Sequence, residues 1–316
     1  MRLRPPLSDY GALFSEGVET DDAAQGRASQ RPRRDEAFRQ TAGLRAKRAI
    51  GTALRFLEPR RIAHLPSTLD LMLRERWVRP SQLPDPCRGL SYAEGFAGLA
   101  VDLSPETMMR AYTMGLSPGA CLGPVAWHSR PQRHVALPTD VARQVRAHSR
   151  PGQPEWRVTF DRDADAVLAA SGRLGKDGAF LPRRLLLAFG ALFDAGFAHT
   201  FEVRDPYGRI VGGGFGVAVG RVFVIEGAFE VQAGAGRVGL VGLMERLRDW
   251  NFALVERAPA AAWLGGEAFF AMTRDDYLEN VRRHLSGAVM DDWRAHSATE
   301  KPIPRAGWRR LATQAA

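Results

Sequence analysis

The stretch Ala198–Phe229, AHTFEVRDPYGRIVGGGFGVAVGRVFVIEGAF, decides the fold because it reads as three consecutive strands. Its apolar patterning predicts strands over Ala198–Arg204, Arg209–Val219 and Val222–Glu226. DPYG is a type I turn signature, and Gly220 with Arg221 forms a second short connection. Strands joined so closely pair antiparallel, so this stretch predicts a β-meander.

Helix and strand signals on both sides of the meander predict an α+β domain. Before it lie a strand at Glu155–Asp161, a short helix ending at Gly172 and an amphipathic helix at Pro182–Gly196. After it come a helix at Gly236–Trp250, a strand at Asn251–Glu256 and a closing helix at Arg274–Leu285. This order predicts a mixed, largely antiparallel sheet flanked by helices, not a doubly wound parallel sheet.

The N-terminal part contains three further helix signals. The clearest is Leu103–Gly115, where Ser104 can cap, Pro105 suits the first turn and Gly115 can end the helix. Ser67–Val78 is a second candidate. Ala37–Leu57 is a basic amphipathic helix, which suits contact with RNA, with a membrane surface or with its own domain.

These signals divide the chain into five expected regions. Residues 1–34 read as a disordered or loop-rich tail, because they are charged and carry few large apolar side chains. The remaining regions are a basic helical extension at 35–80, a small N-terminal domain at 81–150, the main domain at 151–290 and a C-terminal tail at 291–316.

The glycines of the meander do not fit a phosphate-binding loop. A Walker loop needs Gly-Lys-Ser/Thr before a helix, and the meander has none. A dinucleotide fingerprint needs a third glycine where Val219 stands, and here strands lie on both sides. Glycine within a strand is typical of a bulge or a close approach. Gly212–Gly214 therefore either make room for a ligand or peptide backbone, or form a bulge without a further role.

Composition favours a protein that meets polyanions. The 316 residues carry a net charge of +9, which suits nucleic acid, anionic lipid or phosphorylated ligands, and equally suits a genome rich in G and C. Cys87 and Cys121 lack the spacing of a zinc site or a disulfide framework. With no apolar run near the roughly 20 residues of a membrane span and no signal peptide, we expect a soluble cytoplasmic protein.

Several motifs together resemble one family. Asp102–Pro118, DLSPETMMRAYTMGLSP, is followed by Trp127–Pro138, WHSRPQRHVALP, then by GFAHTFEVRD and VGGGFGVAVGRVFVIEGAF. In this order they resemble motifs of the bacterial leucyl/phenylalanyl-tRNA–protein transferases, over about residues 83–285.

The resemblance implies a fold, a reaction and partners. The main domain is expected to have the GCN5-related acetyltransferase-like fold, with a smaller N-terminal domain before it. The family moves Leu, Phe or Met from an aminoacyl-tRNA to an N-terminal Arg or Lys of an acceptor protein, without a metal or other cofactor. The expected partners are therefore aminoacyl-tRNA and an acceptor N-terminus, and we expect a monomer without a membrane span.

The resemblance also implies site residues. Glu226 and Glu256 are the expected catalytic carboxylates, which grip the attacking amine or take its proton. Arg237 and Arg133 are the expected tRNA contacts, Arg237 because it stands at a helix start. Trp127 either stacks on the terminal adenine or fills the core. The expected substrate-binding residues are Trp127, Gly213, Gly214, Phe215, Phe223 and Phe229.

The chain departs from the family pattern at the strand before the last helix. Glu256 stands where the family has Asp, and Ala258 where it has Gln. Losing an orienting amide removes transition-state stabilisation, so altered specificity or lost activity is a second hypothesis. Two alternatives therefore stay open: an acyl-CoA transferase of the same fold, whose phosphate loop would be Gln232–Gly236, and a tRNA-binding protein without catalysis.

Overall fold

The computed structural model describes residues 34, 36, 38, 43, 83–88, 95–120, 125–140, 156–174 and 181–285. The helix expected at Ser67–Val78 lies outside these residues, as do the C-terminal tail and nearly all of Ala37–Leu57. Within the described ranges, no helix is long and apolar enough to cross a bilayer.

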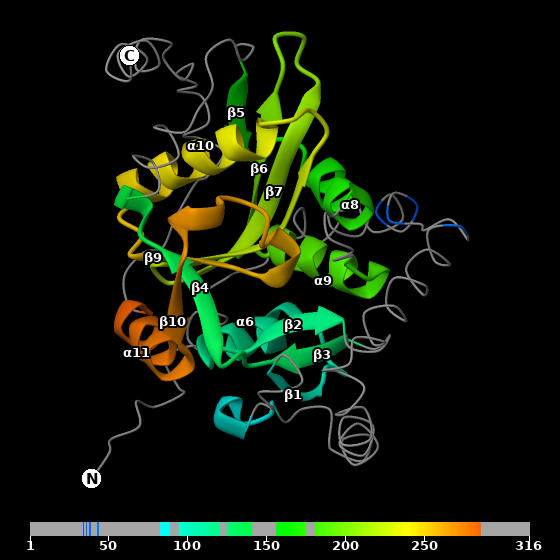
Figure 1. Ribbon diagram of the computed structural model, residues 1–316. Helices are drawn as coiled ribbons and strands as arrows, with labels where there is room; N and C mark the ends of the chain where they lie inside the picture. The colour runs from blue at the N-terminus through cyan, green and yellow to red at the C-terminus, as the bar shows by residue number, and fades with distance from the viewer. Residues whose placement is uncertain are drawn as a thin grey trace.

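A seven-stranded sheet forms the centre of the molecule (Figure 1). Its strands lie in the order β10-β4-β9-β8-β7-β6-β5, and every neighbouring pair is antiparallel except β8–β9. The strands are β4 (Gln132–Ala136), β5 (Arg157–Phe160), β6 (Ala198–Arg204), β7 (Ile210–Val219), β8 (Val222–Glu230), β9 (Leu254–Arg257) and β10 (Phe270–Thr273). The prediction of a mixed, largely antiparallel sheet is confirmed.

The meander forms as expected, but the predicted end of its third strand was wrong. We expected this strand to stop at Glu226, whereas β8 continues to Glu230. The register with β7 shifts there, because Gly216 pairs with Ile225 and Phe215 with Gly227. Glu226 is therefore an extra residue in β8, a β-bulge that lets the strand continue beyond the polar side chain.

Helices cover both faces of the large sheet (Figure 1). Helix α10 (Ala235–Asp249) packs on one face, and α8 (Ala164–Leu174) and α9 (Arg183–Asp194) pack on the other. The glycines of β7 permit this packing. A Cβ on Gly212 would lie 2.7 Å from the Cβ of Ala235, and one on Gly214 would lie 2.6 Å from the Phe201 ring. Protein atoms thus occupy the space that these glycines leave.

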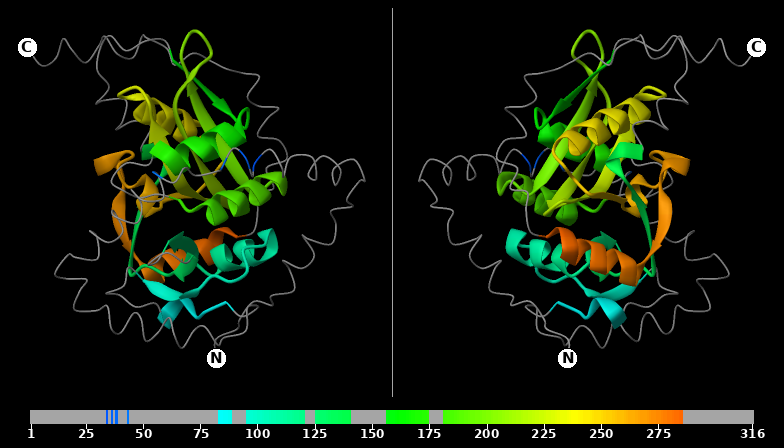
Figure 2. Two further views of the ribbon diagram at one scale, coloured as in Figure 1. Left: turned by 90° about the vertical axis from the view of Figure 1, so that its right-hand side faces the viewer. Right: turned by 90° about the vertical axis from the view of Figure 1, so that its left-hand side faces the viewer.

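A smaller three-stranded sheet, ordered β1-β3-β2, packs below α9 together with α6 and α11 (Figure 2). Its strands are β1 (Phe96–Leu99), β2 (Ser117–Ala120) and β3 (Val125–His128), and the helices are α6 (Pro105–Thr113) and α11 (Arg274–His284). The start of α6 is as predicted, since Ser104 accepts from the Thr107 N–H and Pro105 is the first helical residue.

Neither the strands of the small sheet nor β4 and β10 were predicted, because each has only four or five residues and little apolar alternation. Strand β4 leaves the N-terminal region and inserts between β9 and β10. This insertion brings residues from before position 150 into the large sheet. The expected boundary at 150 stays a prediction, and the core runs across it.

Candidate active site

At the bulge in β8, the Glu226 side chain points toward α6. Its carboxylate is buried, with a residue exposure of 2%, and the Tyr112 hydroxyl donates a hydrogen bond to Glu226 Oε1 at 2.7 Å. Bulges commonly redirect a side chain next to an active site. The hydrogen bond to Tyr112 is one of the buried polar contacts that tie the large sheet to the smaller part of the molecule.

The environment of Glu226 gives its carboxyl group a pKa near neutrality. The pKa of Glu226 is raised from 4.5 to about 7, first because the group is buried and then because of the charge of Glu256. The Tyr112 hydrogen bond and the charges of Arg130 and Arg133 lower the pKa and offset part of this rise. A group with this pKa exchanges a proton readily at physiological pH. Perturbed carboxyl groups of this kind gather at functional sites.

A second carboxylate lies on the adjacent strand. Glu256 of β9 pairs in register with Val224, two residues before Glu226, so the two side chains project from the same face. Arg133 of β4 donates from Nη1 to Glu256 Oε1 at 2.8 Å, and all three charged side chains are buried. The ion pair neutralises Glu256, whereas Glu226 has a neutral phenol as its hydrogen-bond donor.

Two further contacts hold Arg133 in place. Its Nη2 donates to the carbonyl of Gly115, which follows α6, and its guanidinium carbon lies 4.7 Å from the centre of the Tyr277 ring. Burial lowers the pKa of Arg133, but the carboxylates of Glu256 and Glu226 outweigh this and hold the pKa above its usual value. Arg133 therefore stays charged between α6 and α11.

The phenols of Tyr112 and Tyr277 complete what we call the carboxylate cluster: Tyr112, Arg133, Glu226, Glu256 and Tyr277. Burial and the neighbouring carboxylates raise the pKa of both phenols well above 10, so they stay protonated donors. Neither tyrosine was predicted as a site residue, because an aromatic on the inner face of a helix usually indicates core packing. The only sequence signal was Tyr112 within the motif DLSPETMMRAYTMG.

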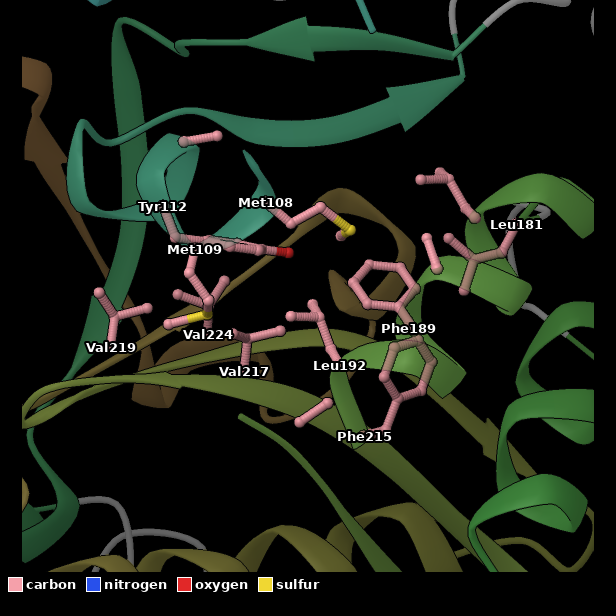
Figure 3. Close-up of a cluster of buried hydrophobic side chains, with 14 of the residues drawn as sticks. Met108, Met109, Tyr112, Leu181, Phe189, Leu192, Phe215, Val217, Val219 and Val224 are labelled. Atoms are coloured by element: carbon pink, nitrogen blue, oxygen red, sulfur yellow. The ribbon is translucent and has the colours of Figure 1, made fainter. Parts of the chain in front are cut away.

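An apolar cluster lies next to Tyr112 (Figure 3). Met108 of α6 points toward Phe189 of α9, whereas Met109 points toward Val219 and Val224 of the sheet. Phe215 of β7 packs edge-on against Phe189, with 4.9 Å between ring centres. These side chains are buried and form packed core. Methionine adapts its shape to what packs on it, so this part of the core can rearrange around a side chain of variable apolar shape. Phe215 and Phe229, two predicted substrate-binding residues, belong to the same core cluster.

The other predicted residues lie apart from the carboxylate cluster. Phe223 is on the opposite face of the sheet, where it packs against Phe252. Trp127 is buried in β3. Gly213 lies against the carbonyl of Phe201, and a Cβ there would come within 2.4 Å of that oxygen. Arg237 is exposed in the first turn of α10, while Arg133 is buried, a position that does not favour direct contact with tRNA.

The loop before α10 is occupied by a carboxylate from its own chain. Glu230 Oε2 accepts hydrogen bonds from the backbone N–H groups of Gly234 and Gly236, each at 3.0 Å. These are the groups that would cradle a phosphate at this helix start. A pyrophosphate would have to displace Glu230 and lie beside its charge.

The raised pKa of Glu226 has a consequence for stability. The folded protein binds the Glu226 proton more tightly than the unfolded chain does. The contribution of this group to the free energy of unfolding is therefore complete below pH 4.5 and decreases as the pH rises toward 7. For a fully buried group this loss is on the order of 3 kcal/mol. We expect Glu226→Gln to gain about that much over the wild type between pH 4.5 and 7, measured by urea unfolding. A constant difference across this range would contradict the raised pKa.

Comparisons with known proteins agree with the motifs. The sequence profile of the family described as Leucyl/phenylalanyl-tRNA protein transferase matches residues 133–282. A protein of that name from Stutzerimonas stutzeri (strain A1501) is 33% identical over 226 residues, which are 69% of this chain and 99% of the relative. Another from Ectopseudomonas mendocina (strain ymp) is 31% identical over 219 residues, 68% of this chain and 96% of the relative.

Proposed function

Because this chain belongs to the leucyl/phenylalanyl-tRNA protein transferase family, we propose that it transfers an apolar amino acid from aminoacyl-tRNA to the N-terminus of an acceptor protein. The observation that carries the proposal is the bulged Glu226, a buried carboxyl group with a pKa of about 7 beside an apolar cluster. The carboxyl group suits an amine nucleophile, and the cluster suits the side chain that is transferred.

In the proposed reaction the acceptor amine attacks the ester carbonyl of the aminoacyl-tRNA. The N–C bond forms, the ester C–O bond breaks, and the amine proton moves through Glu226 to the ribose oxygen that leaves. An α-amine has a pKa of about 8, so a base with a pKa of about 7 is matched to its proton. Tyr112 would hold the Glu226 carboxylate by its 2.7 Å hydrogen bond.

We propose different roles for the two carboxylates expected to be catalytic. Glu226 is the proton acceptor, because its hydrogen-bond donor is a neutral phenol. Glu256 already accepts from Arg133, so we propose that it positions this guanidinium beside Glu226. Ala258 has no polar side chain; its backbone N–H donates to the Ile225 carbonyl at 2.8 Å, and its carbonyl accepts from the Ala261 N–H at 2.9 Å. The substrate-orienting amide of the family is thus replaced by a methyl group.

The apolar cluster supports Leu, Phe or Met as the transferred residue. Met108 and Met109 would yield to the incoming side chain, and Phe189 and Phe215 would contact it from α9 and β7. For tRNA, exposed Arg237 remains the proposed contact, and the net charge of +9 favours phosphate binding. We also propose that the protein is cytoplasmic. We further propose that it is a monomer, because one chain supplies the whole carboxylate cluster.

The decisive experiment is transfer of radiolabelled leucine, phenylalanine or methionine from charged tRNA to a peptide that begins with arginine. We expect label in the peptide with the wild-type protein. If the folded protein binds the charged tRNA but transfers none of the three amino acids, the proposal fails and a tRNA-binding protein without catalysis is favoured.

Acetyl-CoA is expected not to stabilise the protein, because Glu230 fills the loop that would hold its pyrophosphate. A specific ligand at 100 times its Kd adds about 2.7 kcal/mol to the free energy of unfolding, which raises the Tm by several degrees. Thermal unfolding with millimolar acetyl-CoA, and with ATP as a polyanion control, measures this. A rise of several degrees with acetyl-CoA alone would favour the acyl-CoA alternative.

A further inference from the structure

The large sheet ends at β10, whose outer edge is exposed. Among the strands of the described residues, β10 pairs with β4 alone. The Arg274 N–H donates to the Pro131 carbonyl at 3.0 Å, so the N–H groups of Met272 and Phe270, two and four residues back, face β4 as well. The N–H and C=O groups of Ala271 then point outward. An open strand edge of this kind is a template for another extended chain.

Helix α11 lies beside β10 (Figure 1), and side chains of both elements line a groove. The groove has a volume of about 450 Å³. It is lined by Phe270, Ala271, Met272 and Thr273 of β10 and by Asp276, Glu279, Asn280 and Arg283 of α11. A strand edge beside a helix is the arrangement that binds peptides by strand addition, with the backbone on the edge and side chains in the groove. Phe270, which is 49% exposed, offers an apolar contact there.

We infer that this edge groove binds the acceptor polypeptide, as a strand added to β10, through the residues that follow its N-terminus. The inference rests on the proposed transfer to a protein N-terminus. Phe270 of β10 pairs with Val135 of β4, and Val135 pairs with Glu256 of β9, so these three residues lie side by side across the sheet. With strands about 4.8 Å apart, an added strand would lie about 19 Å from β8, the strand that carries Glu226. About six extended residues cover that distance, so the groove would hold residues from about the sixth onward.

Charge favours a polypeptide over tRNA in the groove. Glu279 and Arg283 form an ion pair at 2.7 Å, which leaves the charge of Asp276 in excess. The chain as a whole carries +9, so this groove is a locally acidic part of a basic protein. Phosphates would be disfavoured beside Asp276, whereas a lysine or arginine side chain of the acceptor would be attracted.

The test compares a dipeptide acceptor with an eight-residue acceptor that shares its first two residues and carries lysines from the sixth position onward. The long acceptor is expected to have a lower KM than the dipeptide in the wild type. Ala271→Pro removes one outward N–H without touching the bonds to β4, and Ala271→Val is the control that keeps it. We expect Ala271→Pro to raise the KM of the long acceptor about 3- to 10-fold, with kcat and the dipeptide KM unchanged.

A charge variant provides an independent arm. Asp276 accepts a hydrogen bond from the Thr273 hydroxyl at the end of β10, and asparagine keeps an oxygen for that bond. Asp276→Asn is expected to raise the KM of the long acceptor about 2- to 5-fold, and Asp275→Asn, in the same helical turn but not lining the groove, is the control. If dipeptide transfer persists, either of two results would overturn the inference. One is a wild-type KM that is the same for both acceptors. The other is a KM for the long acceptor that is the same in the wild type and in every variant. Loss of transfer to both acceptors in the wild type would instead contradict the proposed function.

Discussion

Glu226→Gln is expected to lower kcat/KM for transfer by about 10²- to 10⁴-fold, the usual contribution of a general base. The substitution keeps an oxygen that accepts from the Tyr112 hydroxyl, now 2.7 Å from Glu226 Oε1, and removes only the ability to take a proton. The measurement is steady-state transfer to a peptide under saturating aminoacyl-tRNA. A loss below tenfold would remove Glu226 from the role of base.

The pH profile separates this role from a structural one. A base works when deprotonated, so wild-type kcat should rise with pH through an apparent pKa of about 7, the value for Glu226. Glu226→Gln should lose that rise. The matched control is Glu202→Gln, because burial also raises the pKa of Glu202 on β6, where it bonds to Thr159 and Thr200. This control should keep both the rate and the profile.

The elements that were predicted correctly are those whose signals are local. The meander follows from apolar runs separated by DPYG and by Gly220–Arg221, and α6 begins where Ser104 and Pro105 mark a helix start. The carboxylate Glu226 also came from its local motif. Its bulge did not, because a bulge exists only relative to the partner strand, here through the register of β7.

The arrangement of the site, and the residues of it that were missed, depend on contacts between distant parts of the chain. Arg133 and Glu256 were both expected site residues, but they are 123 positions apart, and only the insertion of β4 beside β9 brings them together. The resemblance gave Arg133 as a tRNA contact and did not indicate its burial beside Glu256. Tyr277 becomes a site residue because α11 packs on the end of α6, where Leu278 contacts Gly115. Neither patterning nor composition contains that information.

Arg133→Met is expected to destabilise the protein by about 3–5 kcal/mol, because it leaves Glu256 buried without its partner. Methionine fills most of the arginine volume, so the loss reports the charge and not a cavity. In the double variant with Glu256→Gln most of this loss should be recovered, since no unpaired charge then remains. Urea unfolding measures the free energy of unfolding of the wild type and of each variant. A loss below about 1 kcal/mol for Arg133→Met would contradict a buried ion pair.

A surface pair serves as the control for this experiment. Arg283 and Glu279 form the same kind of ion pair at 2.7 Å, but both side chains are more than 60% exposed, so Arg283→Met should cost under about 1 kcal/mol.

Arg133→Met should also change the reaction. The positive charge of Arg133 lowers the pKa of Glu226, so its removal should move the rise of kcat to higher pH in the folded protein. An unshifted profile would mean that Arg133 acts on stability alone.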